Sequence, residues 1–241
     1  MPQRLSTPAG LVAMTRDEGL AKFQANVLLL MGFGLMVTGA VGAVVVNNPD
    51  LLSYFLVRDG NEPSLTGTWW IVTALEFVLI LGMSGWDKRT KDSPGSIIIF
   101  VIYAALNGLT IAPVMSLYTG ASIFQVCSIT AVTFGASGLW GLTTKRNLSG
   151  AGSFLLMGLV GLIVLMLANF VFRSSAINFV VTFVGLVLFI GLTAYDMNKL
   201  TAMYDAGGNR KGLVVDGALT LYLDFINLLL LFLRIFGVKK D

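Results

Sequence analysis

Near the C-terminus the chain reads Leu219-Thr220-Leu221-Tyr222-Leu223-Asp224-Phe225-Ile226-Asn227-Leu228, inside an apolar run whose only charged residue is Asp224. The preceding apolar run ends at a second acid, Asp196. A carboxylate inside a membrane-length segment costs about 2.5–3.5 kcal/mol on insertion scales. We therefore expect the two acids to be partners and the rest of the chain to build a membrane bundle around them.

The composition is that of an integral membrane protein. Of the 241 residues, 56% are hydrophobic and 12% are charged, against roughly 25% charged in an average soluble domain. The mean hydropathy is +0.82. The net charge of +3 is too small to indicate nucleic acid as a partner. These values predict an all-α integral membrane protein whose main surroundings are the lipid bilayer.

The chain contains no histidine and a single cysteine, Cys127, which lies in an apolar segment. This excludes an intramolecular disulfide, imidazole metal sites, Ser-His catalysis and a histidine pH switch. The segment Gly135-Ala136-Ser137-Gly138 has the form found in intramembrane serine proteases, but such proteases use a Ser-His dyad, so helix packing is the better interpretation. We expect no enzymatic activity and no cofactor, and any proton sensor near neutrality must consist of carboxylates.

Apolar runs of about 20 residues predict seven membrane-spanning helices. The predicted spans cover residues 25–46, 67–86, 96–117, 121–142, 152–172, 176 to 196 or beyond, and 213–236. Residues 1–24 are predicted to be a polar cytoplasmic segment, 25–237 the seven-helix domain and 238–241 a short basic tail. We expect a polar connection at 47–65 and a flexible loop at 205–212.

The distribution of basic residues predicts the orientation. Eleven Lys and Arg residues fall on the side of the N-terminus and five on the other side, so the N-terminus is predicted to be cytoplasmic and, with seven spans, the C-terminus lies outside. The basic tail fits this arrangement poorly. If the last segment were re-entrant, the tail would be cytoplasmic, and re-entry is tolerated where irregular backbone lines a cavity.

The two acids are predicted to lie at one depth. If the sixth helix ends near Tyr204 and the seventh begins near Asp216, each acid is eight residues inside its helix, roughly 12 Å. Two carboxylates in contact share a proton, and full deprotonation would produce repulsion able to move a helix or admit a divalent cation. Alternatively, Asp196 pairs with Lys199 on the surface and Asp224 hydrogen-bonds a neighbouring helix.

Other polar residues in the spans leave two interpretations open. Glu76 either lines the cavity of the acid pair or forms one interhelical hydrogen bond, and Asn227, at i+3 from Asp224, could orient that acid. Asn107, with Glu76 and Asn227 a candidate to line the pore or cavity, belongs to a polar strip on a helix that Pro113 is expected to kink. The basic residues at span ends either snorkel toward the interface or reach inward to neutralise the acids.

The chain resembles the transmembrane Bax inhibitor motif family, also called the Bax inhibitor-1 family, over about residues 20–237. The segments that carry this resemblance are Ala218 to Leu228, Leu233-Arg234-Ile235-Phe236-Gly237, Gly108-Leu109-Thr110, Thr143 to Gly150, and Gly191 to Asp196. The resemblance implies seven helices with the last one surrounded by the other six.

The resemblance also implies a pH-sensitive calcium leak gated by Asp196 and Asp224, which would bind calcium transiently, with Glu76 as the family's acid in the second helix. Family members can carry a basic residue that locks the acid pair; Lys88 and Arg89 are the candidates here, although Asp87 interrupts the match. The expected location is the bacterial inner membrane. An alternative function is a membrane interaction protein that modulates a membrane protease or a stress response.

Overall fold

The computed structural model describes residues 8–59, 62–86, 88–144 and 148–240, and most of them are helical. Expectations that concern residues 1–7, 87, 145–147 and 241 lie outside this part. The long helices are α1 (Pro8–Val46), α3 (Gly67–Gly85), α5 (Pro94–Ser116), α6 (Gly120–Thr143), α7 (Ser149–Phe172), α8 (Ser175–Gly207) and α9 (Lys211–Phe236). Between them lie the short helices α2 (Pro49–Ser53) and α4 (Lys88–Lys91) and the strands β1 (Leu56–Asp59) and β2 (Glu62–Leu65). The predicted all-α class is confirmed.

Six of the described helices are long and apolar enough to cross a membrane: α1, α5, α6, α7, α8 and α9. The remaining long helix, α3, has 19 residues and a shorter apolar part, Gly67–Met83. At 1.5 Å per residue α3 is about 28 Å long, close to the ~30 Å thickness of a hydrocarbon core. A seventh span at α3 therefore stays a prediction.

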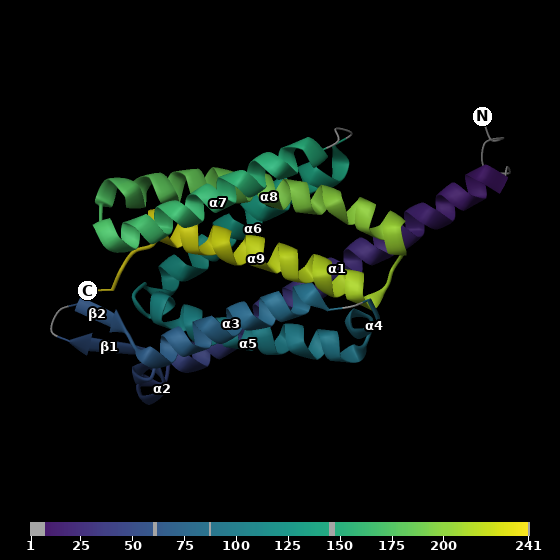
Figure 1. The fold of residues 1–241 in the computed structure, drawn as a ribbon. Helices are drawn as coiled ribbons and strands as arrows, with labels where there is room; N and C mark the ends of the chain where they lie inside the picture. Colours follow the sequence, from purple (N-terminus) through teal and green to yellow (C-terminus); the bar gives the residue numbers. More distant parts are fainter. Residues whose placement is uncertain (1–7, 60–61, 87, 145–147, 241) are drawn as a thin grey trace.

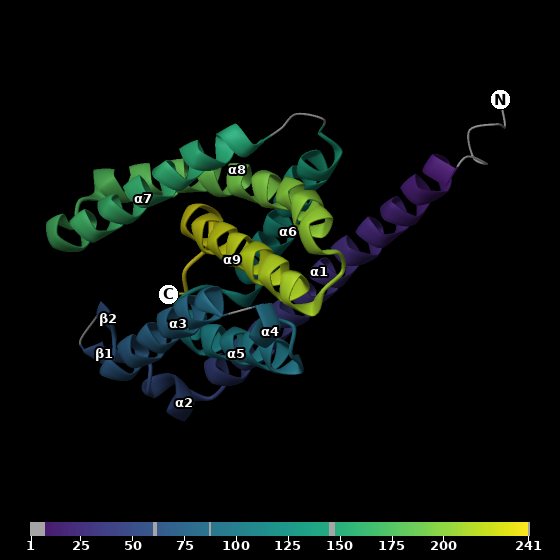
Figure 2. The same ribbon diagram turned by 45° about the vertical axis from the view of Figure 1, so that its right-hand side comes forward.

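The long helices form two groups with α9 between them (Figures 1 and 2). One group contains α1, α3 and α5, and the other contains α6, α7 and α8. Helix α9 contacts α1 and α5 of the first group and also α4, the short helix between α3 and α5. From the second group it contacts α6 and α8. Buried residues are spread around the circumference of α9, which is expected for a helix that packs on several sides.

Glycines bring helices together at two of these interfaces. A Cβ atom at Gly108 of α5 would lie 2.7 Å from the carbonyl oxygen of Thr38 on α1. A Cβ atom at Gly141 of α6 would overlap the backbone of Ala194 on α8. Gly135, by contrast, has no neighbour within 4 Å of such an atom, so close packing explains some of the glycines and not others.

Two predicted loops are more ordered than expected. Helix α8 continues to Gly207 and α9 begins at Lys211, so the prediction of a flexible loop over 205–212 was wrong for most of its length. The chain turns at Gly208, whose φ of 67° is accessible to glycine. In the 47–65 connection, Asn48 caps α2 and a two-stranded antiparallel hairpin follows, with Leu56 opposite Leu65.

The two ends of the described chain lie at opposite ends of the bundle (Figure 1). Helix α1 has 39 residues, about 58 Å, so its first turns project beyond the other helices, and it runs without a break across the predicted boundary at residue 24. Helix α9 is continuous over 26 residues, about 39 Å, and has no break at which the chain could re-enter. This continuity counts against a re-entrant last segment.

Candidate functional site

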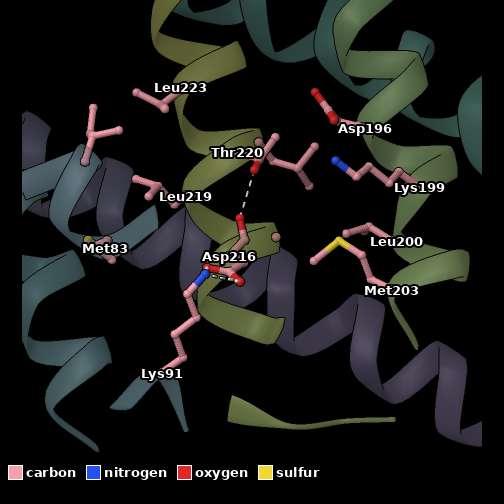
Figure 3. Close-up of a pocket in the computed structure, with 13 residues that line it drawn as sticks. Met83, Lys91, Asp196, Lys199, Leu200, Met203, Asp216, Leu219, Thr220 and Leu223 are labelled. Carbon is pink, nitrogen blue, oxygen red and sulfur yellow. Dashed lines mark hydrogen bonds and ion pairs between the residues drawn. The ribbon is translucent and has the colours of Figure 1, made fainter. Parts of the chain in front are cut away.

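A cavity of about 420 Å³ lies between α8, α9 and the α3–α4 segment (Figure 3). Four charged side chains line it, and the other lining residues are mainly apolar. Asp196 and Lys199 enter it from α8, Asp216 from α9 and Lys91 from α4. Two acids and two bases therefore face one space inside an otherwise apolar bundle.

Asp224 lies behind this cavity rather than in its wall. It is 4% exposed, and its Oδ2 atom has no hydrogen-bond partner within the described residues. Asp196 lies on α8, the helix that packs against α9. A buried carboxylate oxygen without a donor is unfavourable, because burial removes water and nothing replaces it.

The helices hold the two acids deeper than expected from the sequence. Asp196 lies eleven positions before the end of α8, and Asp224 lies thirteen positions after the start of α9. These positions correspond to about 17 and 20 Å along the helices, instead of the roughly 12 Å predicted. Both helices were longer than assumed by similar amounts, so the depths still agree within one helical turn.

The alternative pairing of Asp196 with Lys199 is not seen as an ion pair within the described part of the chain. The Nζ atom of Lys199 lies 6.0 Å from the centroid of the Tyr195 ring. Lys199 lines the same cavity as Asp196, so it supplies a positive charge near this acid without a direct ion pair.

A further ion pair at this cavity was missed in the sequence. Lys91 Nζ donates to both carboxylate oxygens of Asp216, at 3.1 and 3.0 Å (Figure 3). Asp216 shares one face of α9 with Thr220 and Asp224, at i, i+4 and i+8. This spacing could have revealed Asp216 as a residue of the cavity, although not its partner Lys91.

The residue after Lys91 also contacts α9. Asp92 accepts a hydrogen bond from the Gly212 backbone at 2.9 Å, so the start of α9 is held to the connection before α5.

Of the two predicted lock residues, the structure describes the side chain of Arg89 only, and Arg89 does not line the cavity. Arg89 is exposed, and the side chain of Lys88 lies outside the described part. Lys91, three positions after Lys88, is the basic residue of α4 that lines the cavity. It contacts Asp216 and not the two deeper acids.

Glu76 and Asn107 belong to a separate buried network on the opposite side of α9. Thr110 Oγ1 donates to Glu76 Oε1 at 2.8 Å, and Asn107 Nδ2 makes a longer contact of 3.4 Å with Glu76 Oε2. The Tyr222 hydroxyl donates to Asn107 Oδ1 at 2.9 Å and lies 2.7 Å from the Thr38 hydroxyl. Because Tyr222 and Asp224 are about 200° apart on one helix, this network links α1, α3, α5 and α9 away from the cavity.

Two other expectations concern single side chains. Asn227 donates its amide to the Leu223 carbonyl of its own helix at 2.8 Å, and no hydrogen bond to Asp224 is present among the described residues. Ser137 donates to carbonyl groups of its own helix, Thr133 and Phe134, at 2.9 and 3.1 Å. The Ser137 hydroxyl is thus bonded to carbonyl groups of its own helix and not to a side chain that could act as a general base.

These features define a class: a multi-pass α-helical membrane protein with an acid-containing cavity beside a second, buried acid. The chain belongs to the family described as inhibitor of apoptosis-promoting Bax1, whose sequence model matches residues 20–241. The resemblance seen in the sequence is thereby confirmed.

Bacterial relatives match nearly the whole chain. The inner membrane protein YbhL of Escherichia coli K12 is 39% identical over 229 residues, which cover 92% of this chain and 94% of the relative. An uncharacterized protein of Caulobacter vibrioides is 35% identical over 243 residues, covering 98% and 96%. An uncharacterized membrane protein of Streptococcus pyogenes serotype M3 is 32% identical over 225 residues, covering 92% and 94%.

Proposed function

We propose that this protein is a proton-regulated calcium leak channel, without enzymatic activity, in a bacterial inner membrane. The observation that carries the proposal is the position of two acids on adjacent helices: Asp196 in the cavity wall and Asp224 buried behind it. The membrane assignment is supported by the apolar helices and by the similarity to an inner membrane protein of Escherichia coli. The N-terminus is placed in the cytoplasm and α3 is taken as the seventh span, with α9 as the central helix.

In the closed state, Asp196 and Asp224 share one proton, so that only one negative charge is buried between α8 and α9. Loss of that proton places two negative charges near each other. Two unit charges 4 Å apart repel by about 4 kcal/mol at an effective dielectric constant of 20. That energy loosens the contact between α8 and α9 and opens a path for ions through the cavity.

Calcium is the transported ion in this proposal and not a resident cofactor. Calcium prefers oxygen ligands, and carboxylates supply them. The described residues contain no group of three or more His, Cys, Asp or Glu side chains that could hold a metal. A resident calcium ion takes about 6–8 oxygen ligands, whereas a pair of carboxylates suits an ion that binds briefly and moves on.

The test is calcium flux into proteoliposomes measured across a pH series. The wild-type protein should conduct more as pH rises, because deprotonation opens the path. The Asp196→Asn/Asp224→Asn variant should lose this pH dependence. Asp205→Asn is the matched control, since Asp205 pairs with Arg16 at the exposed end of α8 and away from the cavity. The proposal fails if the double variant and the wild type show equal flux at every pH.

A second candidate function is a membrane interaction protein that modulates a membrane protease or a stress response. It is favoured by the first turns of α1, which project beyond the bundle as a helix (Figure 2). The same proteoliposomes separate the two functions. A protein that lacks residues 2–14 keeps its calcium flux if it is a channel, and loses only the effect on its partner if this segment is the contact. If the deletion leaves the effect on the partner unchanged, this second candidate function is excluded.

A further inference from the structure

A pocket of about 550 Å³ lies at the end of the bundle opposite the N-terminus, where α8 begins and α9 ends (Figure 1). Two basic residues line it, Arg234 in the last turn of α9 and Lys239 in the C-terminal tail. Asn178 in the first turn of α8 lines it as well. None of these residues contributes to the cavity of Asp196.

The basic tail is docked on the bundle, although the sequence predicted only a short tail. The Thr119 amide donates to the Val238 carbonyl and the Lys240 amide to the Leu117 carbonyl, both at 2.9 Å. The Val238 amide donates to Ser122 Oγ at 2.8 Å. These three bonds hold the tail against the turn between α5 and α6. The backbone of Lys239, which forms a bridge with Tyr118, is thereby fixed beside the pocket.

The pocket offers hydrogen-bond donors and positive charge, and no acid of residues 8–59, 62–86, 88–144 and 148–240 lines it. No Asp or Glu is among its lining residues, and neither Arg234 nor Lys239 forms an ion pair with another described residue. Asn178 Oδ1 accepts from Asn169 Nδ2 at 2.7 Å, which leaves the Asn178 Nδ2 group without an acceptor in the described chain. Three donors from three segments therefore surround one space.

One wall of the pocket is apolar and faces outward. Phe179 and Phe183 line it, pack against each other with ring centroids 4.4 Å apart, and are 63% and 44% exposed. On a membrane-spanning helix, such exposed aromatic side chains contact lipid. The pocket thus joins a basic, donor-rich end to a surface that acyl chains cover.

From this combination we infer that the pocket binds the phosphate group of an anionic phospholipid. Arg234 and Lys239 contact the phosphate oxygens, Asn178 donates through Nδ2, and an acyl chain lies along Phe179 and Phe183. The site also accounts for a basic tail on the side that otherwise carries few bases: the tail completes an anion site. This inference does not depend on the calcium channel.

Native mass spectrometry of the detergent-purified protein tests it. Phosphatidylglycerol, phosphatidylcholine and inorganic phosphate are added in separate series. The wild type should retain one phosphatidylglycerol molecule more tightly than phosphatidylcholine. The Arg234→Gln/Lys239→Gln variant should bind phosphatidylglycerol roughly tenfold more weakly, because both charged contacts are lost.

The matched control is Arg173→Gln/Lys240→Gln, which removes two bases from the same end of the molecule that do not line the pocket. It should bind phosphatidylglycerol like the wild type. Equal binding by the pocket variant and the wild type would overturn the site, as would an equal loss in the control. Inorganic phosphate binding as tightly as phosphatidylglycerol would show that a free anion is the ligand instead. Thermal melting of each variant verifies that it is folded.

Discussion

Replacing Lys91 with glutamate is expected to raise calcium flux on the order of tenfold at low ionic strength. In the wild type, Lys91 neutralises Asp216 through two contacts of about 3 Å at the part of the cavity nearer the helix ends. The replacement frees the Asp216 carboxylate and adds a second one. Negative charge concentrates cations at an entrance, and salt screens the effect. The flux increase should therefore shrink as salt is added, which proteoliposome measurements at two ionic strengths will show.

Two variants make this result specific. Lys91→Glu combined with Asp216→Lys reverses the pair and should restore the wild-type flux. Arg16→Glu makes the same change of charge in the Arg16–Asp205 pair, whose contacts of 3.0 and 2.8 Å lie outside the cavity, and should leave flux unchanged. An increase of the same size in Arg16→Glu would mean that overall surface charge, and not the cavity, controls the leak.

Replacing Asn107 with leucine is expected to lower the free energy of unfolding by about 1–3 kcal/mol. Asn107 is the residue that joins Glu76 to Tyr222, so its loss leaves a carboxylate oxygen and a hydroxyl group with fewer partners in a buried site. Buried polar groups without partners are costly, although interhelical hydrogen bonds in membranes are individually modest. Unfolding of the protein in detergent micelles, followed by circular dichroism, measures the change.

Asn227→Leu is the matched control for Asn107→Leu. Both residues are asparagines within membrane-length helices, but within the described part of the chain the Asn227 amide bonds only the Leu223 carbonyl of its own helix. Its replacement should cost less, because no other helix loses a partner. Equal destabilisation by the two substitutions would show that the network around Glu76 does not hold the helices together.

The helices were predictable because lipid imposes length and composition on them. Runs without charge, such as the one from Pro94 to Thr144, admit few arrangements, and the break predicted between residues 117 and 121 agrees with the observed one to within one residue. The end of α8 was placed too early, because the segment from Asp205 to Gly208 contains residues typical of loops. There the Arg16–Asp205 pair and the contact of Phe23 with Tyr204 stabilise the last turns against α1. Contacts between distant segments cannot be read from local sequence.

The same limit applies to the site. The spacing of Asp196 and Asp224 predicted their similar depth, because two antiparallel helices joined by a short connection align residues at equal distances from it. The sequence left open whether Glu76 lines the cavity of the acids or makes an interhelical hydrogen bond. The structure shows the hydrogen bonds, because α3 packs on α5 and α5 packs on the face of α9 that carries Tyr222. The contact of Lys91 with Asp216 depends on how α4 turns before Pro94, which no periodic pattern reports.

The proposed channel requires Asp196 and Asp224 to titrate as a coupled pair, and infrared difference spectroscopy of the carboxylic acid band follows their protonation. The purified protein is titrated in lipid, and the wild type is compared with Asp196→Asn and Asp224→Asn; Glu76→Gln accounts for the third intramembrane acid. We predict that replacing either aspartate shifts the pH at which the other one titrates, because the two share a proton. If the remaining aspartate titrates at the same pH in the single variants as in the wild type, the two acids act independently and the account is wrong.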